Sequence, residues 1–440
     1  MRTSTIRKSL FKQIRSLDKS ECVLDPSRNF TRNRKLSFEQ VISAVLALNS
    51  GSLTNDLLDF FHYSESMPSS SAFIQQRSKV LPAAFQSLLY AFNYDMERVC
   101  PPPTFKGLRL LAIDGSDIHI PTNAQDHDSS CFTNNGLQTY NMLHLNALYD
   151  LLSHTYTDAL VQKYRHMNEH RAFTELVDRS SVKHALIIAD RGYESFNNMA
   201  HIQEKNWFYL IRIKDGFGGI ASGSDLPDEE EFDFPLTLAL VRRQTTHTKS
   251  LLSMRNQYRF VPSSSNFDYL PSKSKKHDPI QFYSLSFRIV RFQITENTYE
   301  TVVTNLPSDT FPSAVLKQLY AMRWGIETSF RALKYTIGLL HFHSKKTEYI
   351  LQEIFARLIM YNFTEMIISC VVVKQKKRKY EYKVNFSIAA HVCRKFYLQD
   401  ISPPKVEMQI ICHVVPIRPN RKGKRDKHVN TAVHFTYRVS

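Results

Sequence analysis

The chain has 440 residues, 42% of them hydrophobic, so it can bury a core and is too long for one simple domain. Its 57 lysines and arginines exceed the 41 acidic residues, giving a net charge of +16, which points to a polyanionic partner, while charge alone leaves open the alternative of a basic enzyme without one. The composition excludes a wholly disordered chain, and six cysteines without zinc-site or disulfide spacing predict a reducing cytoplasm.

Basic residues gather at the two ends of the chain. Residues 1–35 hold ten basic and three acidic residues, and residues 371–440 hold sixteen basic and four acidic residues. The middle is close to neutral, which predicts a core flanked by segments that bind a polyanion. The runs "KQKKRK" (374–379) and "RPNRKGKRDKH" (418–428) could hold DNA, and the alternative is that they are ordinary solvated segments.

Residues 36–100 read as helical. "LSFEQVISAVLAL" has apolar residues at helical spacing, and "SLTNDLLDFF" begins with capping residues. After Pro68, "SSSAFIQQRSKVLPAAFQSLLYAF" could form the turn and second helix of a DNA-binding unit, or equally an ordinary helical bundle. In the first case the side chains facing a duplex would be Gln75, Gln76, Arg77 and Lys79. Three prolines and a glycine near residue 103 predict a domain boundary.

The next block alternates strands and helices. "LRLLAID" reads as a strand ending at Asp114, and "DIHIP" as a second strand ending at Pro121. Further strands are predicted at "MLHLNALYD", "HTYTDALVQ", "HALIIAD" and "WFYLIRIK". Helices are predicted at "NEHRAFTELVDR" and "SFNNMAHIQEK". This order predicts an α/β domain with a mixed sheet.

A β-rich insertion is predicted between about residues 215 and 297. It begins with the Gly-rich and acidic "GFGGIASGSDLPDEEEFD", followed by strand-like "SLLSMRNQYRFVPSS" and "PIQFYSLSFRIVRFQIT". "TYETVVTNLP" then returns as a strand that stops at Pro307. The apolar stretch from Ile354 to Val373 contains Arg357 and Glu365, so it predicts a buried helix and no membrane span.

Two aspartates share one kind of setting. Asp114 in "IDGS" and Asp190 in "ADRGY" each end an apolar strand and precede a glycine-containing turn. If the two strands are neighbours, the carboxylates converge at the edge of the sheet and need a cation between them, for which oxygen ligands favour Mg²⁺. The alternative, favoured for either residue alone, is a simple turn-forming aspartate.

The helix "YAMRWGIETSFRALK" carries a third acid. Because seven helical residues return a side chain to within about 20° of its start, a narrow stripe is expected. Its members are Tyr320, Arg323, Glu327 and Lys334. A phosphate-handling site could use the acid for metal and the bases for phosphate oxygens. The alternative is a solvated face whose Arg–Glu pair contributes a few tenths of a kcal/mol.

This spacing resembles the YREK signature of DDE transposases, specifically the insertion-sequence group called the IS-four family. Asp114, Asp190 and Glu327 then occupy the acidic triad of that family. "TNLP" before the helix and "MYNFTE" (360–365) after it are also similar to the family. The resemblance covers about residues 105–370.

The resemblance implies a ribonuclease-H-like catalytic domain at residues 104–345, carrying the β-rich insertion. A helical DNA-binding domain (1–103) would precede it, and a helical and basic region (346–440) would follow. It implies two Mg²⁺ ions, for which Mn²⁺ would substitute, held by the three acids of the triad. The residues expected to bind DNA phosphates are Tyr320, Arg323 and Lys334.

The implied activity is cut-and-paste transposition: hydrolysis of one DNA strand, attack by the freed 3′-hydroxyl, commonly through a hairpin, and strand transfer. The implied partners are terminal inverted repeats, target DNA and a second copy of the chain, in the nucleoid of a prokaryotic cytoplasm. The alternatives are an inactive DNA-binding regulator and a plain metal-dependent nuclease.

The resemblance leaves further DNA contacts open. Trp324 and Arg191 are candidates, against core packing for the tryptophan and carboxylate pairing for the arginine. An aromatic residue of the insertion would hold a flipped base, but the sequence does not select one. The aromatic residues available there include Tyr258, Phe260, Phe282, Tyr283 and Phe287.

Overall fold

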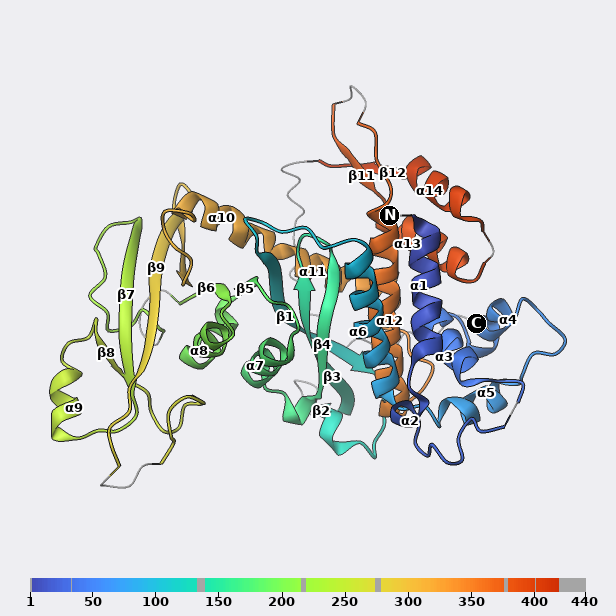
Figure 1. The fold of residues 1–440 in the computed structure, drawn as a ribbon, viewed down its shortest axis with the longest axis horizontal. Coiled ribbons are helices and arrows are strands. Elements are labelled where there is room, and N and C mark those ends of the chain that lie inside the picture. Colours follow the sequence, from blue (N-terminus) through green and yellow to red (C-terminus); the bar gives the residue numbers. More distant parts are fainter. Residues whose placement is uncertain are drawn as a thin grey trace.

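The protein folds around one large mixed sheet, with a helical bundle at one end and the insertion at the other (Figure 1). The computed structural model describes residues 2–32, 34–132, 139–214, 219–273, 278–375, 379–399 and 401–418. Within them, ten strands join the sheet in the order β2-β3-β1-β5-β6-β10-β9-β7-β8, with β4 paired to β3. The expected mixed α/β architecture is therefore confirmed.

The N-terminal part is helical, as predicted. Its helices are α1 (Thr3–Ser16), α2 (Lys19–Cys22), α3 (Phe38–Ala47), α4 (Leu53–Phe60), α5 (Ser70–Arg77) and α6 (Pro82–Val99). A capping box between Ser37 and Gln40 starts α3, and the Ser52 side chain caps α4. Helix α1 was not predicted, although its apolar residues share one face at helical spacing.

Helix α12 (Thr347–Ile368) forms the axis of the bundle, with α1, α3 and α6 packed against it (Figure 1). It is buried along most of its length, as the apolar stretch predicted. The C-terminal elements are β11 (Tyr382–Val384), α13 (Phe386–Tyr397), α14 (Pro403–Cys412) and β12 (Val414–Pro416). Helices from both ends of the chain thus share one hydrophobic core, and the predicted division at residues 103 and 345 stays a prediction.

The central strands form an antiparallel group followed by parallel neighbours. They are β1 (Arg109–Ile120), β2 (Ser130–Phe132), β3 (Thr139–Asp150), β4 (Thr155–Lys163), β5 (Ala185–Ala189), β6 (Phe208–Arg212) and β10 (Thr298–Thr304). β3 is antiparallel to β1 and β4, whereas β5 is parallel to both β1 and β6. Short helical turns connect some of them: η1 (His127–Ser129), η2 (Tyr164–His166) and η3 (Arg191–Tyr193).

Two hydrophobic cores cover the two faces of this sheet. Alternate residues of β5 belong to different cores, because successive side chains of a strand point to opposite faces. Helices α7 (Glu169–Arg179) and α8 (Phe196–Glu204) pack in one core, and the bundle helices pack in the other. The prediction of two strands separated at Asp114 is wrong, because β1 continues through it and pairs with β3 along both halves.

The insertion extends the same sheet. It contributes β7 (Phe232–Val241), β8 (Tyr258–Phe260) and β9 (Tyr283–Thr295), and its β-rich character is confirmed. Strand β7 was not predicted. The predicted strand-like segment "SLLSMRNQYRFVPSS" contains the short strand β8, but its first two residues belong to helix α9 (Thr246–Leu251), whose cap is Thr245. The capping box satisfies the first backbone groups of α9 and therefore favours a helix over a strand at that point.

The expectation that Arg77 faces a duplex is wrong, because its side chain is only 2% exposed. Its Nε donates to Gln352 Oε1 at 2.7 Å, and its Nη2 donates to the carbonyl of Tyr349 at 2.7 Å. Its Nη1 lies 3.0 Å from Glu353 Oε1. The guanidinium therefore joins α5 to α12 inside the bundle.

The carboxylate of Glu353 has a second cationic neighbour. His343 Nδ1 lies 3.0 Å from Glu353 Oε2, and His343 Nε2 lies 3.0 Å from Asp56 Oδ2 of α4. Burial alone would raise the pKa of Glu353, but Arg77 and His343 lower it to about 2. A chain of buried charges thus fixes two N-terminal helices on α12.

Two further predictions concern a membrane-spanning helix and the basic runs near the C-terminus. In the described part of the chain, no helix combines the length and apolar character needed to cross a bilayer. The basic run at 374–379 is described except for residues 376–378, and the run at 418–428 lies outside the described residues apart from Arg418. Their proposed grip on DNA stays a prediction.

Replacing Arg77 with methionine should lower the free energy of unfolding by about 3–5 kcal/mol, because Glu353 would remain buried without its main cation. Chemical denaturation measures this change. Gln75→Ala, on the exposed side of the same helix, is the matched control and should stay within about 0.5 kcal/mol of the wild type. An Arg77→Met variant as stable as the control would contradict this role for the ion pair.

Candidate active site

Asp114 and Asp190 lie level with each other on neighbouring strands. Ala112 of β1 pairs in parallel with Ile188 of β5, and the two aspartates follow two residues further along each chain. Residues level with each other on parallel strands point to the same face. The conditional prediction that neighbouring strands bring these two residues together is therefore supported by the register.

The carboxyl group of Asp114 is half-buried and lies near two other acids and one arginine. One oxygen accepts a hydrogen bond from the backbone N–H of Gly115 at 2.9 Å. Burial raises the pKa of Asp114 to about 6, with further increases from the charges of Glu327 and Asp190 and a decrease from Arg323. All three acids therefore lie within electrostatic reach of one another.

Asp190 ends β5 and begins the turn η3. Its Oδ1 accepts a hydrogen bond from the backbone N–H of Arg191 at 2.7 Å. The hydroxyl of Tyr320 donates to the same oxygen at 3.4 Å. Tyr320 thus connects the helix of the third acid to the second acid.

The helix with the third acid is not regular. It consists of α10 (Ser313–Met322), α11 (Trp324–Arg331) and the π-helical turn η4 (Ala332–Thr336). A π-helical turn has more residues per turn than an α-helix, so the α-helical stripe that was predicted does not continue to its end. Lys334 instead reaches β1, where its Nζ donates to the carbonyl oxygen of Asp117 at 2.8 Å.

Arg323 lies at the centre of this helix and faces Glu327. Its Nη2 donates to Glu327 Oε1 at 2.9 Å, and its guanidinium lies over the rings of Tyr320 and Trp324, at 5.8 and 5.3 Å from their centroids. The side chain is buried, and its Nε has no hydrogen-bond partner among the described residues. A buried donor without a partner is a natural position for an anionic ligand.

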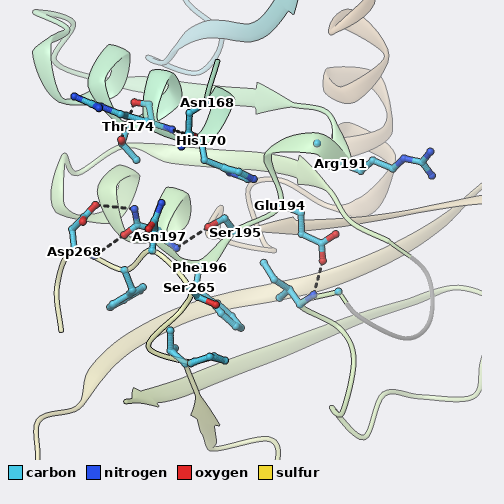
Figure 2. Close-up of a pocket in the computed structure, with 18 of the residues that line it drawn as sticks. Asn168, His170, Thr174, Arg191, Glu194, Ser195, Phe196, Asn197, Ser265 and Asp268 are labelled. Carbon is cyan, nitrogen blue, oxygen red and sulfur yellow. Dashed lines mark hydrogen bonds between the residues drawn. The ribbon is translucent and has the colours of Figure 1, made fainter. Parts of the chain in front are cut away.

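Trp324 and Arg191 are both accessible. Trp324 is 53% exposed, so the alternative that it packs in the core is wrong. Arg191 extends from η3 away from the other labelled side chains (Figure 2). Within the described residues its guanidinium forms no ion pair, in contrast to the alternative of carboxylate pairing.

A histidine that was not predicted lies against Gly115. His144 on β3 stands opposite Asp117 of β1, with Nδ1 2.7 Å from Asp117 Oδ1 and Nε2 3.2 Å from Glu169 Oε1. Burial alone would lower the pKa of His144, but these two carboxylates raise it to about 9. The β1–β3 register brings His144 and Asp117 together, and α7 contributes Glu169, so no local sequence motif predicts the cluster.

Gly115 leaves the space that His144 occupies. A Cβ atom built on Gly115 would lie 2.3 Å from Nε2 of His144. The glycine of "IDGS" is therefore explained by close packing of the imidazole, because any side chain here would displace it.

A cavity of about 1130 Å³ begins at Asp190 and runs between η3, α7, α8 and the insertion (Figure 2). Asn197 Nδ2 donates to Asp268 Oδ2 at 2.8 Å, which joins α8 to the insertion along this cavity. Its lining combines three exposed cations, Arg171, Arg191 and Lys214, with three carboxylates, Asp190, Glu194 and Asp268. The cavity therefore has mixed charge, and an anion would be held at its cationic positions.

Of the insertion aromatics named above, Phe260 is the one that lines the cavity. Phe287 is buried, and the hydroxyl of Tyr283 donates to a carboxylate of α8. Tyr258 and Phe282 pack edge to face, with centroids 6.0 Å apart. Phe260 is therefore the aromatic of this group that a ligand in the cavity could contact.

The three acids offer the carboxylate oxygens that a divalent metal prefers, but their side chains are not arranged around one ion. Within the described residues, no three His, Cys, Asp or Glu side chains converge enough to hold one ion as they stand. Glu327 is turned toward Arg323, and one oxygen of Asp190 accepts two hydrogen bonds. Carboxylate oxygens are nevertheless the ligands that Mg²⁺ prefers, and a divalent ion would relieve the charge that raises the pKa of Asp114.

Comparisons with known proteins were made for the whole chain. A family model described as "Transposase DDE domain" matches residues 105–363. No curated protein matches the chain. Among solved structures, a cryo-EM structure of the piggyBac transposase synaptic complex with hairpin DNA is similar, with a TM-score of 0.39 and 10% sequence identity. The match covers 97% of this chain and 85% of that chain.

The pKa of His144 should depend on its two carboxylate partners and be measurable as about 9 by NMR pH titration. Because the folded pKa exceeds the unfolded value of 6.5, this contribution to stability is complete below pH 6.5 and disappears as the pH rises through about 9. The stability difference between wild type and His144→Asn should therefore shrink by about 1–2 kcal/mol between pH 6 and pH 10, allowing for the partly exposed partners.

The control for this titration is His184→Asn, which removes an exposed imidazole outside the cluster. Its stability difference from the wild type should not follow the same pH dependence. A pKa of His144 at or below 6.5 would contradict the ion pairs with Asp117 and Glu169.

Proposed function

The chain belongs to the transposase DDE domain family, and we propose that it is a cut-and-paste transposase of an IS-four insertion sequence with a ribonuclease-H-like catalytic domain. The family match makes the chain a DNA-cleaving transposase. The sheet order supports the finer fold proposal, since antiparallel β4, β3 and β1 are followed by β5 and β6 in parallel. The observation that carries the proposal is the parallel register of β1 and β5, which places Asp114 and Asp190 level with each other at neighbouring strands.

We infer that Asp114, Asp190 and Glu327 hold the catalytic metal. When bound, two Mg²⁺ ions, or Mn²⁺ in their place, would activate a water molecule and neutralise charge on the phosphate oxygens at the scissile bond. The chain itself supplies three carboxylates from three segments, and the low polarity around Asp114 strengthens every charge interaction there. Arg323 bonds one oxygen of Glu327, so the second oxygen of that carboxylate would be the one offered to a metal.

Arg323 would also bind a phosphate oxygen, because its Nε has no hydrogen-bond partner in the described residues. Tyr320 and Trp324 hold it in place by their ring faces. Tyr320 would donate its hydroxyl to a phosphate oxygen near Asp190. Lys334 would bind a phosphate on the β1 side of the site, where burial lowers its pKa. Phosphoryl transfer requires mainly such positioning and neutralisation.

We propose that the cavity beside Asp190 takes a DNA strand leading to the scissile phosphate. Arg171, Arg191 and Lys214 would bind its phosphates, and Phe260 would stack on a base. The substrates would be double-stranded terminal repeats and target DNA, held by a homodimer, with a hairpin intermediate between cleavage and strand transfer. Such an enzyme would act at the nucleoid of a prokaryotic cytoplasm.

Replacing Glu327 with glutamine should reduce metal-dependent cleavage of duplex DNA by at least about 100-fold, while DNA binding stays within about 3-fold of the wild type. The reason is that glutamine keeps the side-chain shape but removes the negative charge that a metal requires. A cleavage assay on DNA carrying the flanks of the gene measures the first quantity, and a binding assay measures the second.

Glu348→Gln is the matched control, because Glu348 is exposed at the start of α12 and should leave cleavage unchanged. Full cleavage by Glu327→Gln would reject the assigned role. Binding without cleavage by every variant, including the wild type, would favour a DNA-binding regulator. Cleavage without joining of a cut 3′ end to target DNA would favour a plain nuclease.

Replacing Arg171 and Arg191 together with glutamine should weaken DNA binding. The plot of log affinity against log salt, whose slope is negative, should become shallower by about 2, close to 0.9 for each phosphate that is no longer neutralised. Binding measured over a series of salt concentrations gives this slope. The control variant, Lys183→Gln with Lys249→Gln, removes the same charge from exposed positions outside the cavity. Equal slopes for the two double variants would contradict a DNA path through the cavity.

A further inference from the structure

Helix α11, which carries Glu327, is short and has irregular backbone at both ends. It has eight residues and is followed directly by the π-helical turn η4. At its start, the backbone N–H of Arg323 donates to the carbonyl of Tyr320, and that of Ile326 donates to the carbonyl of Arg323. These hydrogen bonds span three residues in place of the four of an α-helix. A continuous α-helical ladder therefore does not fix the rotation of α11, and contacts outside the helix have to do so.

The buried face of α11 is apolar except for Ser329. Its other buried residues are Ile326 and Phe330. Ser329 follows Glu327 by two residues and therefore lies about 200° around the helix from it, nearly on the opposite side. Apolar contacts have no preferred direction, whereas a hydrogen bond requires a particular orientation of donor and acceptor. Ser329 is thus the buried residue of α11 whose side chain can fix how the helix is rotated.

Ser329 is hydrogen-bonded to Tyr156 of β4. The two hydroxyl oxygens lie 2.8 Å apart, and Ser329 Oγ donates to the carbonyl of Ile326 at 2.7 Å. Because a serine hydroxyl has one hydrogen to donate, Tyr156 is the donor in the bond between the two side chains. Both side chains are buried, so the bond is shielded from solvent. It joins α11 to the sheet.

Tyr156 lies at an irregularity in the pairing of β3 with β4. Leu148 of β3 pairs with Asp158, whereas the next residue of β3 pairs with Tyr156. Thr157 is therefore an additional residue of β4, which makes a β-bulge. A bulge disrupts the ladder locally and redirects the side chains beside it, so the direction of the Tyr156 side chain depends on what holds the bulge.

Asn362 of α12 holds the backbone of Tyr156. Its Oδ1 accepts from the backbone N–H of Tyr156 at 2.8 Å, and its Nδ2 donates to the carbonyl of the same residue at 2.8 Å. Asn93 of α6 donates to that carbonyl at 2.9 Å and accepts from Asn362 Nδ2 at 3.0 Å. Asn362 belongs to "MYNFTE" (360–365), a motif to which the candidate active site gives no role. Its amide instead fixes the bulge from the bundle side.

We propose that Tyr156, held by Asn362, is a positioning residue for Glu327. The hydrogen bonds run from α12 through the bulge of β4 to the buried face of α11, so they set the rotation of the helix. That rotation determines how far the carboxylate of Glu327 lies from Asp114 and Asp190. The hydroxyl of Tyr156 is buried and acts through α11, as the outer partners of metal ligands do when they orient them. The inference rests on the proposed role of Glu327 in holding metal.

The test measures Mn²⁺ binding to the full chain without DNA, by electron paramagnetic resonance, which detects the free ion. Tyr156→Phe removes only the hydroxyl and should weaken Mn²⁺ binding by about 3- to 10-fold, the equivalent of one hydrogen bond. Ser329→Ala should weaken it to a similar extent. The double variant should bind Mn²⁺ little more weakly than either single variant, because both changes remove the same bond.

Tyr397→Phe is the matched control. Its buried hydroxyl donates to the carbonyl of Ser43 at 2.9 Å, so it joins α13 to α3 and not to α11. Like Tyr156→Phe, this variant loses one buried hydrogen bond and should unfold at a lower temperature than the wild type. It should bind Mn²⁺ as the wild type does. The comparison therefore separates the position of Glu327 from a general loss of stability.

Equal Mn²⁺ affinities of Tyr156→Phe and Tyr397→Phe would overturn the proposal, as would effects of Tyr156→Phe and Ser329→Ala that multiply in the double variant. The Glu327→Gln variant distinguishes this failure from failure of the proposed function. If Glu327→Gln weakens Mn²⁺ binding and Tyr156→Phe does not, only the positioning role is rejected. If Glu327→Gln binds Mn²⁺ as the wild type does, the metal role of Glu327 is rejected and the positioning role with it.

Discussion

The parallel pairing of β1 with β5 is the constraint on which the arrangement of acidic side chains depends. Both strands are buried on two faces, and the two aspartates lie just beyond the segment in which the strands pair. Asp114 and Asp190 are level at that point. Helix α11 then brings Glu327 toward them from the bundle side, where it packs on β1. The two cores therefore fix the positions of residues that are 76 or more places apart in sequence.

Arg323 balances the negative charge that this arrangement concentrates. It lowers the pKa of Asp114 and pairs with Glu327, and two aromatic rings restrict where its guanidinium can move. The pKa of Asp114 is nevertheless raised to about 6, chiefly by burial and further by the charges of Glu327 and Asp190. We propose that added cations would offset the charge of the three acids, and that Arg323, whose Nε has no hydrogen-bond partner in the described residues, would lie beside an incoming phosphate. Binding of metal and of phosphate are expected to support each other for this reason.

Much of the sheet could be predicted from sequence because buried strands are short apolar runs, as in "HALIIAD" for β5. Asp114 and Asp190 were predicted as a pair from their positions at the ends of two apolar strands, and the resemblance joined Glu327 to them; the register of β1 and β5 supports the pair. The π-helical turn η4 (Ala332–Thr336) could not be predicted, because no residue type is typical of such a turn. Nor could the position of His144, which depends on the β1–β3 register.

The net charge of +16 combines two kinds of cation that sequence cannot distinguish. Arg77 and Arg357 are buried and hold the bundle together, the latter through the carbonyl of Leu48, and burial lowers the pKa of Arg357 to about 10. Arg32 and Arg191 are exposed, and no carboxylate in the described residues neutralises them. Arg77 and Arg357 would destabilise the fold if they lost their partners, so they are unavailable to a phosphate. Exposed cations such as Arg191 have no such structural role, and they are the part of the net charge that we propose for DNA.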